Sequence, residues 1–468
     1  MTVRTVFGAA LALGVAALAA LAWTRFEGDA PQIAAPEQLV VGADGREIAV
    51  ELRDAGMGLQ RIAAALVHAK GEAELLVEEL PGSWFSGSLE RERAIALRID
   101  PKAMGLADGS AQLRISAEDW SWRRNRSVLE IPVEIDRVPP RVAVLSGLTY
   151  VDQGGAAAVV YQLSEATARD GVEVAGANGS QFYPGFAYPS QPAAPAAVDA
   201  SSGEGAQSVL PSTPVSGQRI ALFGVDRDAG KDAAIRVLAA DHAGNEARAG
   251  WNLVLRPRAF PQGNVTLPGS FLQNVVPELA KQGGIDVSDP VEAFRQINSE
   301  MRRANEALIR EKLAGSADEA LWTGPFEQLE NSKVTSRFAE ARVYFVDGQQ
   351  VSNAIHYGYD LASLARAEIT AANAGRVRHA GDLGIYGGCV LLDHGLGVGS
   401  VYGHLSRIDV REGEQVAKGQ RLGLSGATGL AGGDHLHFAI LVGPTYVDPV
   451  EWWDEKWVRE HIDAQLGR

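Results

Sequence analysis

Short runs of alternating apolar and polar residues fill the first half of the chain. Between about residues 34 and 137, segments such as "REIAVELRD" and "SVLEIPVEID" are separated by turn residues. Alternation with a period of two is typical of strands that bury one face, and several such strands with turns between them favour an antiparallel β-sandwich. A second stretch of this kind covers residues 138–257. We therefore predict two β-sandwich modules in tandem.

Two short turns suggest what kind of sandwich these modules are. The turn "DHAGN" at residues 241–245 resembles the penultimate turn of bacterial immunoglobulin-like domains, and "DRVPP" resembles the junction between tandem copies of them. Both modules are therefore expected to be immunoglobulin-like. Within the second module, residues 183–214 are rich in Pro, Ala, Ser and Gly. Such a composition buries too little apolar surface to order itself, so we expect a long mobile loop there.

The hydrophobic period changes from two to that of a helix after Ser288. Asp289 can cap the first turn, Pro290 suits the first helical position, and Glu292 can complete a capping box. Apolar residues then recur at spacings of three or four: Val291, Phe294, Ile297, Met301, Ala304 and Leu308. The pattern predicts an amphipathic helix inside a helical linker over residues 258–330. This helix is either a spacer packed on the next domain or a segment over residues 289–314 that covers a site there until displaced.

An uncharged, mostly apolar run extends from Thr5 to Trp23, with an arginine on each side. A helix of about 17–25 apolar residues spans a bilayer, and Trp23 resembles an interfacial anchor. The tripeptide Ala-Leu-Ala before Trp23 offers a cleavage site, so a secretory signal peptide is the alternative. We expect residues 1–26 to be a single transmembrane anchor or a signal peptide, with the anchor preferred. Either leaves the rest of the chain outside the cytoplasm, in the periplasm.

Charge and cysteine content narrow the classes of function. The 468 residues carry a net charge of -15, and this excess of acidic groups argues against nucleic acid as a partner, because that affinity depends on Lys and Arg. The single cysteine, Cys389, has no intrachain disulfide partner. It lies in the apolar stretch "GGCVLLDHG", which predicts a buried strand rather than a reactive thiol.

Seven of the nine histidines lie at or after residue 356, so the chemistry is expected in the last third of the chain. His356 and Asp360 can face one point, and His435 and His437 project from one face of a strand. Imidazoles, one carboxylate and an open position are the set that a catalytic zinc site uses, whereas a structural site would be closed by four protein ligands. A non-haem iron site uses the same ligand types and is the alternative.

The order of motifs over residues 333–452 is more specific than any single pair. The chain reads "HYGYD", "GGCVLLDHG", "YGHLS", "VAKGQ", "GLSGATG" and "HLHF" in succession. This order resembles the lysostaphin and LytM-type zinc metallopeptidases, which cut peptide cross-links in bacterial cell walls. The resemblance implies a mainly β chain that ends in an antiparallel LytM-type peptidase domain at residues 331–455, followed by a polar helical tail at residues 456–468.

The resemblance also implies roles for five residues. His356, Asp360 and His437 match the ligands of one Zn²⁺ per peptidase domain. His435 and His404 match two catalytic histidines that do not bind the metal. His435 is the candidate general base, while His404 would orient the attacking water or stabilise the oxyanion. Which histidine takes the proton stays open.

One further histidine, His394, and two positions that differ from the family pattern lie near the proposed site residues in the sequence. His394 is expected to have a structural role. The family often has glycine where this chain has Ala339, and Gly-Pro or Gly-Thr where it has Gly433-Asp434. Neither departure falls on a proposed ligand, so activity is expected to survive.

The resulting prediction is an exported zinc endopeptidase that hydrolyses peptide cross-links or stem peptides of peptidoglycan. It would be held at the inner membrane by its N-terminal helix, with the sandwich modules as spacers or as sites for protein partners. The alternative is a catalytically restrained LytM-like factor that regulates other cell-wall hydrolases. Loss of a ligand or catalytic histidine often marks such factors, and all five positions are intact here.

Overall fold

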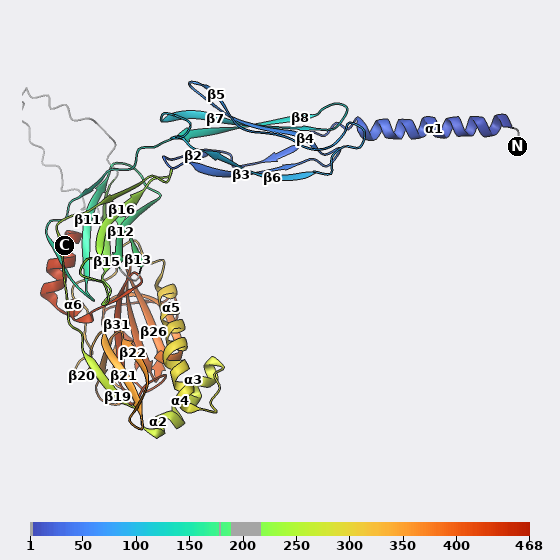
Figure 1. Ribbon diagram of the computed structural model, residues 1–468. Coiled ribbons are helices and arrows are strands. Elements are labelled where there is room, and N and C mark those ends of the chain that lie inside the picture. The colour runs from blue at the N-terminus through green and yellow to red at the C-terminus, as the bar shows by residue number, and fades with distance from the viewer. Residues whose placement is uncertain (1–2, 177–178, 189–216) are drawn as a thin grey trace, which may run out of the picture. The chain divides into compact units, whose positions relative to one another are not determined.

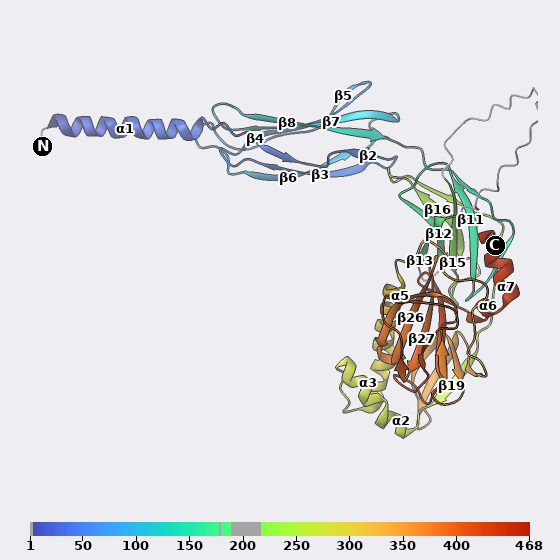
Figure 2. The same cartoon turned by 180° about the vertical axis from the view of Figure 1, so that it is seen from behind.

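The computed structural model describes residues 3–176, 179–188 and 217–468, with side chains from residue 12 onward. The chain is mainly β, as predicted (Figures 1 and 2). It divides into two compact units: Met1–Pro140 with Ala240–Glu246, and Arg141–Ala239 with Ala247–Arg468. Most of the loop predicted at residues 183–214 lies outside the described residues.

The apolar N-terminal run forms a helix, α1, over Val3–Arg25. In the part of the chain that the structure describes, no helix combines the length and the apolarity needed to cross a membrane. The transmembrane anchor is therefore not confirmed and stays a prediction.

The first unit has two sheets that face each other through one core. One sheet has the order β1 (Gln32–Ala34), β3 (Arg46–Arg53), β6 (Glu92–Ile99). The other has the order β2 (Leu39–Val41), β8 (Arg126–Ile135), β7 (Gly109–Asp119), β4 (Leu59–His68), β5 (Gly71–Glu79). Every second residue of β3 is buried, namely Ile48, Val50 and Leu52, as the alternation predicts. The immunoglobulin-like relationship of this sandwich stays a prediction.

The second module belongs to the second unit and contains two four-stranded sheets and one strand pair. The first sheet has the order β14 (Phe186–Ala187), β15 (Gln218–Gly224), β11 (Ala156–Leu163), β9 (Val142–Val144). The second has the order β13 (Gly179–Pro184), β12 (Arg169–Gly176), β16 (Ala234–Ala240), β17 (Glu246–Ala249), and the pair is β10 (Thr149–Asp152) with β18 (Leu253–Arg256). The start of the predicted loop is thus strand, in β13 and β14.

The predicted linker is mostly helical, but it begins with a strand. β19 (Gln262–Thr266) pairs in parallel with β21 (Glu340–Val346) of the next domain. The helices that follow are α2 (Gly269–Asn274), α3 (Val276–Gly283), α4 (Pro290–Gln296), the π-helical η1 (Ile297–Met301) and α5 (Arg302–Leu313). Because β19 completes a sheet of the C-terminal domain, the linker is part of that domain's structure.

The helix start is confirmed, whereas the predicted apolar stripe is only partly right. Asp289 Oδ1 accepts the N–H groups of Val291 and Glu292 at 2.9 and 3.1 Å. Beyond the π-turn, however, Ala304 is exposed and Ile309 is buried. The wider π-turn rotates the following helix relative to an uninterrupted α-helix, so the buried face shifts along the sequence.

The C-terminal domain is built on an eight-stranded sheet (Figure 1). Its order is β20 (Lys333–Ser336), β23 (Tyr359–Ala362), β31 (Leu436–Val442), β27 (Val398–Leu405), β26 (Gly388–Gly395), β25 (Gly375–Asp382), β29 (Gln415–Val416), with β32 (Thr445–Val447) on β31. Smaller sheets are formed by β19, β21 and β22 (Gln349–His356), and by β24 (Glu368–Thr370), β30 (Arg421–Leu424) and β28 (Arg407–Ile408). Every residue of β27 and β31 is buried, so these two strands form the rigid centre of the domain.

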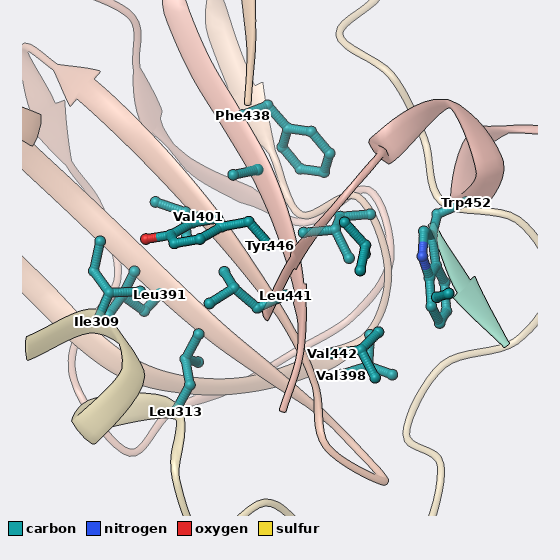
Figure 3. Close-up of a cluster of buried hydrophobic side chains, with 14 of the residues drawn as sticks. Ile309, Leu313, Leu391, Val398, Val401, Phe438, Leu441, Val442, Tyr446 and Trp452 are labelled. Atoms are coloured by element: carbon teal, nitrogen blue, oxygen red, sulfur yellow. The ribbon is translucent and has the colours of Figure 1, made fainter. Parts of the chain in front are cut away.

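Side chains from α5 and the central strands interlock in the core. Figure 3 shows Ile309 and Leu313 of α5 beside Leu391 of β26, with Leu441 of β31 nearby. Apolar packing thus fixes α5 to the central sheet.

The predicted polar tail is packed rather than free. It forms α7 (Glu455–Trp457), η3 (Val458–Asp463) and α8 (Ala464–Leu466) after α6 (Pro449–Trp453). Val458, Ile462 and Leu466 are buried, and Ser146 Oγ donates to Gln465 Oε1 at 2.7 Å. One apolar face of the tail therefore covers the second module.

Candidate metal centre and active site

Strand pairing brings the predicted site residues together. Asp360 of β23 lies directly opposite His437 of β31, and His437 lies opposite Gly403, the residue before His404, on β27. His356 is the last residue of β22. His435 precedes β31, where its N–H donates to Gly426 O at 3.0 Å. Residues far apart in sequence thus meet because the central strands are antiparallel neighbours.

Three side-chain atoms form a compact group that could hold a metal ion. His356 Nε2 lies 2.9 Å from Asp360 Oδ1 and 3.0 Å from His437 Nδ1, and His437 Nδ1 lies 3.0 Å from Asp360 Oδ1. Nitrogen and oxygen ligands of a tetrahedral zinc ion lie roughly 3.3 Å apart, given bond lengths of about 2.0–2.1 Å. The three atoms therefore have nearly the spacing that zinc requires.

Hydrogen bonds outside this group fix which ring nitrogen faces it. His356 Nδ1 lies 3.1 Å from the carbonyl oxygen of Arg337, which can only accept, so Nδ1 carries the proton and the Nε2 lone pair points at the group. With Nδ1 protonated, His356 Nε2 offers a lone pair to the group, and an ionised Asp360 carboxylate offers only lone pairs. A cation at their centre would satisfy all of them, so the donor set fits a bound metal.

The electrostatics favour the charge states that a metal needs. Burial lowers the pKa of His437 to about 4, so this imidazole is neutral at pH 7. Burial alone would raise the pKa of Asp360, but its interactions with the surrounding histidines, His356 above all, hold it well below its usual value. A neutral imidazole and an ionised carboxylate are the forms that bind metal.

Arg342 supports the second oxygen of Asp360. Its Nη2 donates to Asp360 Oδ2 at 2.7 Å, and its Nε donates to Glu340 Oε2 at 3.0 Å. Ser336 also contacts both Arg342 and Glu340. Sequence analysis gave Arg342 no role, since only the pairing of β20, β21 and β23 shows that its guanidinium reaches Asp360.

Gly358 is required by the close approach of two strands. A Cβ atom at this position would lie 2.6 Å from His437 Cε1 and 2.7 Å from the carbonyl oxygen of Phe438. Such distances are too short for any side chain. The glycine between His356 and Asp360 is therefore what allows β23 to approach β31 beside a ligand.

The two remaining histidines border the three-atom group. His435 Nε2 lies 3.5 Å from Asp360 Oδ1, and the His404 and His435 ring centroids are 4.7 Å apart. His435 Nδ1 donates to Gly433 O and His404 Nδ1 donates to Thr428 O, each at 2.8 Å. In each ring Nδ1 therefore carries a proton. In the neutral form of the ring, Nε2 then carries a lone pair and points away from the carbonyl oxygen.

The same two histidines differ in their affinity for a proton. Burial lowers the pKa of His404 to about 3, so its imidazole stays neutral. Burial would also lower the pKa of His435, but the hydrogen bond to Asp360 and the charge of that carboxylate raise it above the usual value. His404 is held at a φ of 64°, a conformation that non-glycine residues rarely adopt. Backbone strain of this kind is common at functional sites.

The structure shows a backbone effect at Ala339 and side-chain hydrogen bonds at Asp434, the two positions that differ from the family pattern. Ala339 has a φ of 59°, in the left-handed region that glycine occupies without strain, so alanine is the costlier residue there. Asp434 accepts the hydroxyl of Ser425 at 2.5 Å and the N–H of Arg366 at 2.9 Å. Its carboxylate thus links the segments around Arg366 and Ser425 to the residue that precedes His435.

A cavity of about 150 Å³ adjoins these residues. Its wall includes all five predicted site residues and Arg342, and also Arg302 of α5 and the loop Leu430–Gly432. A second cavity of about 480 Å³ shares Arg302, Arg342 and the same loop. Ligand pockets usually have about 300–1000 Å³, so the first cavity is small for a peptide.

The other residues singled out from the sequence lie away from this cavity. His394 is fully buried, and its two ring nitrogens lie 2.7 Å from Ala374 O and from Ser400 Oγ. Burial lowers its pKa to about 4, in keeping with a neutral structural residue. Cys389 is also fully buried, and burial raises the pKa of its thiol.

Comparisons with known proteins define the class of this domain. Residues 354–449 match Peptidase family M23. The region around this site is therefore an M23 peptidase domain, the lysostaphin- and LytM-type domain that the sequence predicts.

Several named proteins are similar to part of this chain. The peptidoglycan DD-endopeptidase ShyB of Vibrio cholerae serotype O1 is 33% identical over 119 residues, or 25% of this chain and 27% of that protein. The DD-carboxypeptidase/endopeptidase Mpg of Neisseria meningitidis serogroup B is 34% identical over 96 residues, or 20% of this chain and 22% of that protein. The murein hydrolase activator NlpD of Salmonella typhimurium is 29% identical over 217 residues, or 44% of this chain and 54% of that protein.

A solved structure, the catalytic domain of lysostaphin from Staphylococcus simulans, is 27% identical. The match covers 28% of this chain and 98% of that one, with a TM-score of 0.24. The chain spans about a quarter of the length of the first curated relatives that it matches.

Proposed function

We propose that the protein is a zinc-dependent endopeptidase that hydrolyses peptide cross-links or stem peptides of bacterial peptidoglycan. The observation that carries this proposal is the group of His356 Nε2, Asp360 Oδ1 and His437 Nδ1, mutually within 3.0 Å, with two further histidines beside it. The M23 match and the peptidoglycan DD-endopeptidase named above support the reaction and the class of substrate.

The proposed roles follow from the tautomers and charges of the chain's own residues. Zinc held by His356, Asp360 and His437 would make the water bound to it acidic enough to supply hydroxide near pH 7. His435, whose Nε2 faces Asp360, would take the proton of the attacking water and pass it to the leaving amine. Its raised pKa suits both transfers.

His404 is better suited to orienting the water than to stabilising an oxyanion. Its Nδ1 proton is used by Thr428 O, and its low pKa keeps Nε2 unprotonated. An unprotonated Nε2 accepts a hydrogen bond, whereas an oxyanion needs a donor. This favours one of the two roles that the sequence left open for His404.

The proposal is tested by incubating the full-length protein with peptidoglycan of several wall chemistries and analysing the released muropeptides. New peptide ends should appear, and a metal chelator should abolish them until zinc is restored. If no chemistry yields new ends, with zinc bound at one ion per chain, the endopeptidase proposal fails for the protein as it stands.

A second candidate function is a restrained factor that regulates other cell-wall hydrolases. Arg302 of α5 contributes to the wall of the 150 Å³ cavity, where its Nη2 is held by Asn298 Oδ1 at 2.9 Å. Asn298 Nδ2 in turn donates to Ser352 Oγ of β22 at 2.9 Å. The similarity to the murein hydrolase activator NlpD also favours this candidate.

Replacing Arg302 distinguishes the two functions. Arg302→Ala removes a guanidinium from the wall shared by the two cavities, while Arg303→Ala is the matched control on the exposed side of the same helix. If the helix restrains the site, the Arg302→Ala protein should cut peptidoglycan at least tenfold faster than the native and Arg303→Ala proteins. Equal rates in all three would exclude a restraint by Arg302.

We also propose that the protein is exported and held at the inner membrane by α1. The apolar run over Thr5–Trp23 and a wall substrate on the far side of that membrane support this location. A fusion of alkaline phosphatase after residue 468 should be active, because that enzyme needs the oxidising periplasm to fold. Alkaline extraction then separates an anchored chain, which stays with the membranes, from a cleaved one.

A further inference from the structure

Large apolar side chains gather at one end of the first unit, where three segments of the chain meet. They come from the end of α1, from the connection between β5 and β6, and from the turn between β7 and β8. We call this set the apolar tip; it consists of Trp23, Phe26, Trp84, Phe85, Leu89 and Trp122. Trp23, Trp84 and Leu89 are 85, 60 and 101% exposed. Single exposed apolar residues are ordinary, but ring contacts link Phe26, Trp122, Trp84 and Phe85 into a contiguous group, which marks an interaction site.

The apolar tip is held in place by specific contacts. Trp122 Nε1 donates to Trp84 O at 2.7 Å, and Arg25 Nε donates to Phe85 O at 2.7 Å. The Trp122 N–H donates to Arg25 O at 2.9 Å. The ring centroids of Phe26 and Trp122 lie 5.1 Å apart in an edge-to-face arrangement. The rings of Phe26, Trp84 and Trp122 are thus preorganised, so little conformational entropy is lost when they are buried.

Arginines surround the same end of the unit. A cavity of about 790 Å³ beside the apolar tip is lined by Trp23 and Phe26 together with Arg25, Arg91 and Arg123. Glu27 and Asp29 also line it, and the carboxylates of Asp54 and Asp119 lie close to that of Glu27, so the site has no excess of positive charge. The cavity nevertheless places three guanidinium groups, which pair well with phosphate, beside the aromatic rings.

We propose that the apolar tip and the arginines beside it dock on the surface of a phospholipid membrane. Tryptophan and phenylalanine rings enter the interfacial region of a bilayer, and arginines bind the phosphates of its headgroups. The tip is continuous with α1, whose Leu13 and Leu18 are exposed. This continuity, and guanidinium groups within reach of headgroup phosphates, favour a lipid surface over a protein partner. The inference rests on the proposed membrane location of α1 and not on the peptidase activity.

The docking surface would hold the first module against the membrane, so that β4 points away from it. Leu59, at the start of β4, pairs with Asp119 beside the tip, and His68, at its end, pairs with Gly71. Ten residues of strand cover about 30 Å. Lys70, in the turn after β4, is exposed and lies at the far end of the module.

The test measures which end of the module touches lipid in the full-length protein. Leu89→Cys and Lys70→Cys are each labelled with an environment-sensitive dye; the native Cys389 is fully buried and stays unlabelled in the folded protein. Each protein is reconstituted with vesicles containing phosphatidylglycerol and a lipid-attached quencher. The dye at residue 89 should be quenched at least threefold more strongly than the dye at residue 70.

Variants separate docking of the tip from retention of the chain by α1. Trp84→Ser with Phe85→Ser, in the labelled Leu89→Cys protein, should abolish quenching while the protein still floats with the vesicles. Val138→Ser removes an exposed apolar residue elsewhere in the unit and should change nothing. A second double variant, Arg91→Glu with Arg123→Glu, should also abolish quenching. Both arginines are exposed, so their replacement does not open the core. Equal quenching at residues 70 and 89, or quenching that survives both tip variants, would overturn the proposal.

Discussion

The support that Arg342 gives to Asp360 leads to a quantitative prediction. Arg342→Met keeps most of the side-chain volume but removes the hydrogen bonds to Asp360 Oδ2 and Glu340 Oε2. Groups that orient a metal-binding carboxylate typically contribute about 10–100-fold to metal affinity. The Kd for zinc should therefore rise by about that factor, equivalent to roughly 1.4–2.7 kcal/mol.

Arg342→Met should also destabilise the zinc-free protein. Breaking a buried ion pair by removing one partner costs about 3–5 kcal/mol, because the other charge stays buried. Asp360 and Glu340 would both lose their cation. Arg342→Lys should give an intermediate Kd, since a single ammonium cannot reproduce the branched contacts of a guanidinium.

The assay is competition for zinc with a chromogenic chelator, together with denaturant unfolding of the zinc-free protein. Arg295→Met is the matched control, because Arg295 forms an exposed pair with Glu292 on α4. Exposed pairs contribute only about 0–1 kcal/mol, so this variant should bind zinc like the native protein. A Kd for Arg342→Met within twofold of the native value would refute the support of Asp360 by Arg342.

Three further predictions concern backbone and buried charge. Ala339→Gly should raise the free energy of unfolding by up to about 1 kcal/mol, since it relieves a left-handed alanine; a loss of stability in denaturant titration would count against this. Gly358→Ala should weaken zinc binding at least tenfold, because the new Cβ meets the His437 ring; unchanged affinity in the chelator assay would exclude that clash. Burial raises the pKa of Glu451 well above its usual value, so the native protein loses stability as pH rises through that raised pKa, whereas Glu451→Gln does not. The Tm of the variant relative to native should therefore be higher at pH 8 than at pH 5, and an equal difference at both pH values would contradict the burial of a neutral Glu451.

Much of the candidate site could be predicted from the sequence because its residues lie in short, ordered motifs. The period of two places His435 and His437 on one side of the chain, and the family resemblance separates their roles. The support of Asp360 by Arg342 could not be predicted, because it depends on β20, β21 and β23 lying side by side. Nothing local in the sequence marks Arg342 as different from other arginines on alternating strands.

In the helical linker, the sequence pattern predicted the start of the helix but not its buried face after η1. The capping motif at Asp289 correctly fixed the start of α4, because a cap depends on neighbouring residues alone. The π-turn η1 then shifted the buried face, so that Ile309 is buried instead of Ala304. A π-turn is stabilised by packing in its surroundings rather than by a local signal, and an unbroken helical period cannot reveal it.

The strain at Ala339 could be read from the sequence only through the family resemblance. An alanine in place of an expected glycine signals either a different backbone or a cost in stability. The φ of 59° shows that the backbone is kept. The departure therefore concerns stability more than the arrangement of the ligands.

The central claim is that His437 holds the metal while His435 works on the water beside it. It is tested most directly by measuring zinc per chain and peptidoglycan cleavage in the His435→Ala and His437→Ala proteins. We expect the His435→Ala protein to retain one zinc ion per chain and to lose cleavage, and the His437→Ala protein to lose both. Loss of zinc from His435→Ala, or cleavage by that protein at the native rate, would contradict the division of roles between the two histidines.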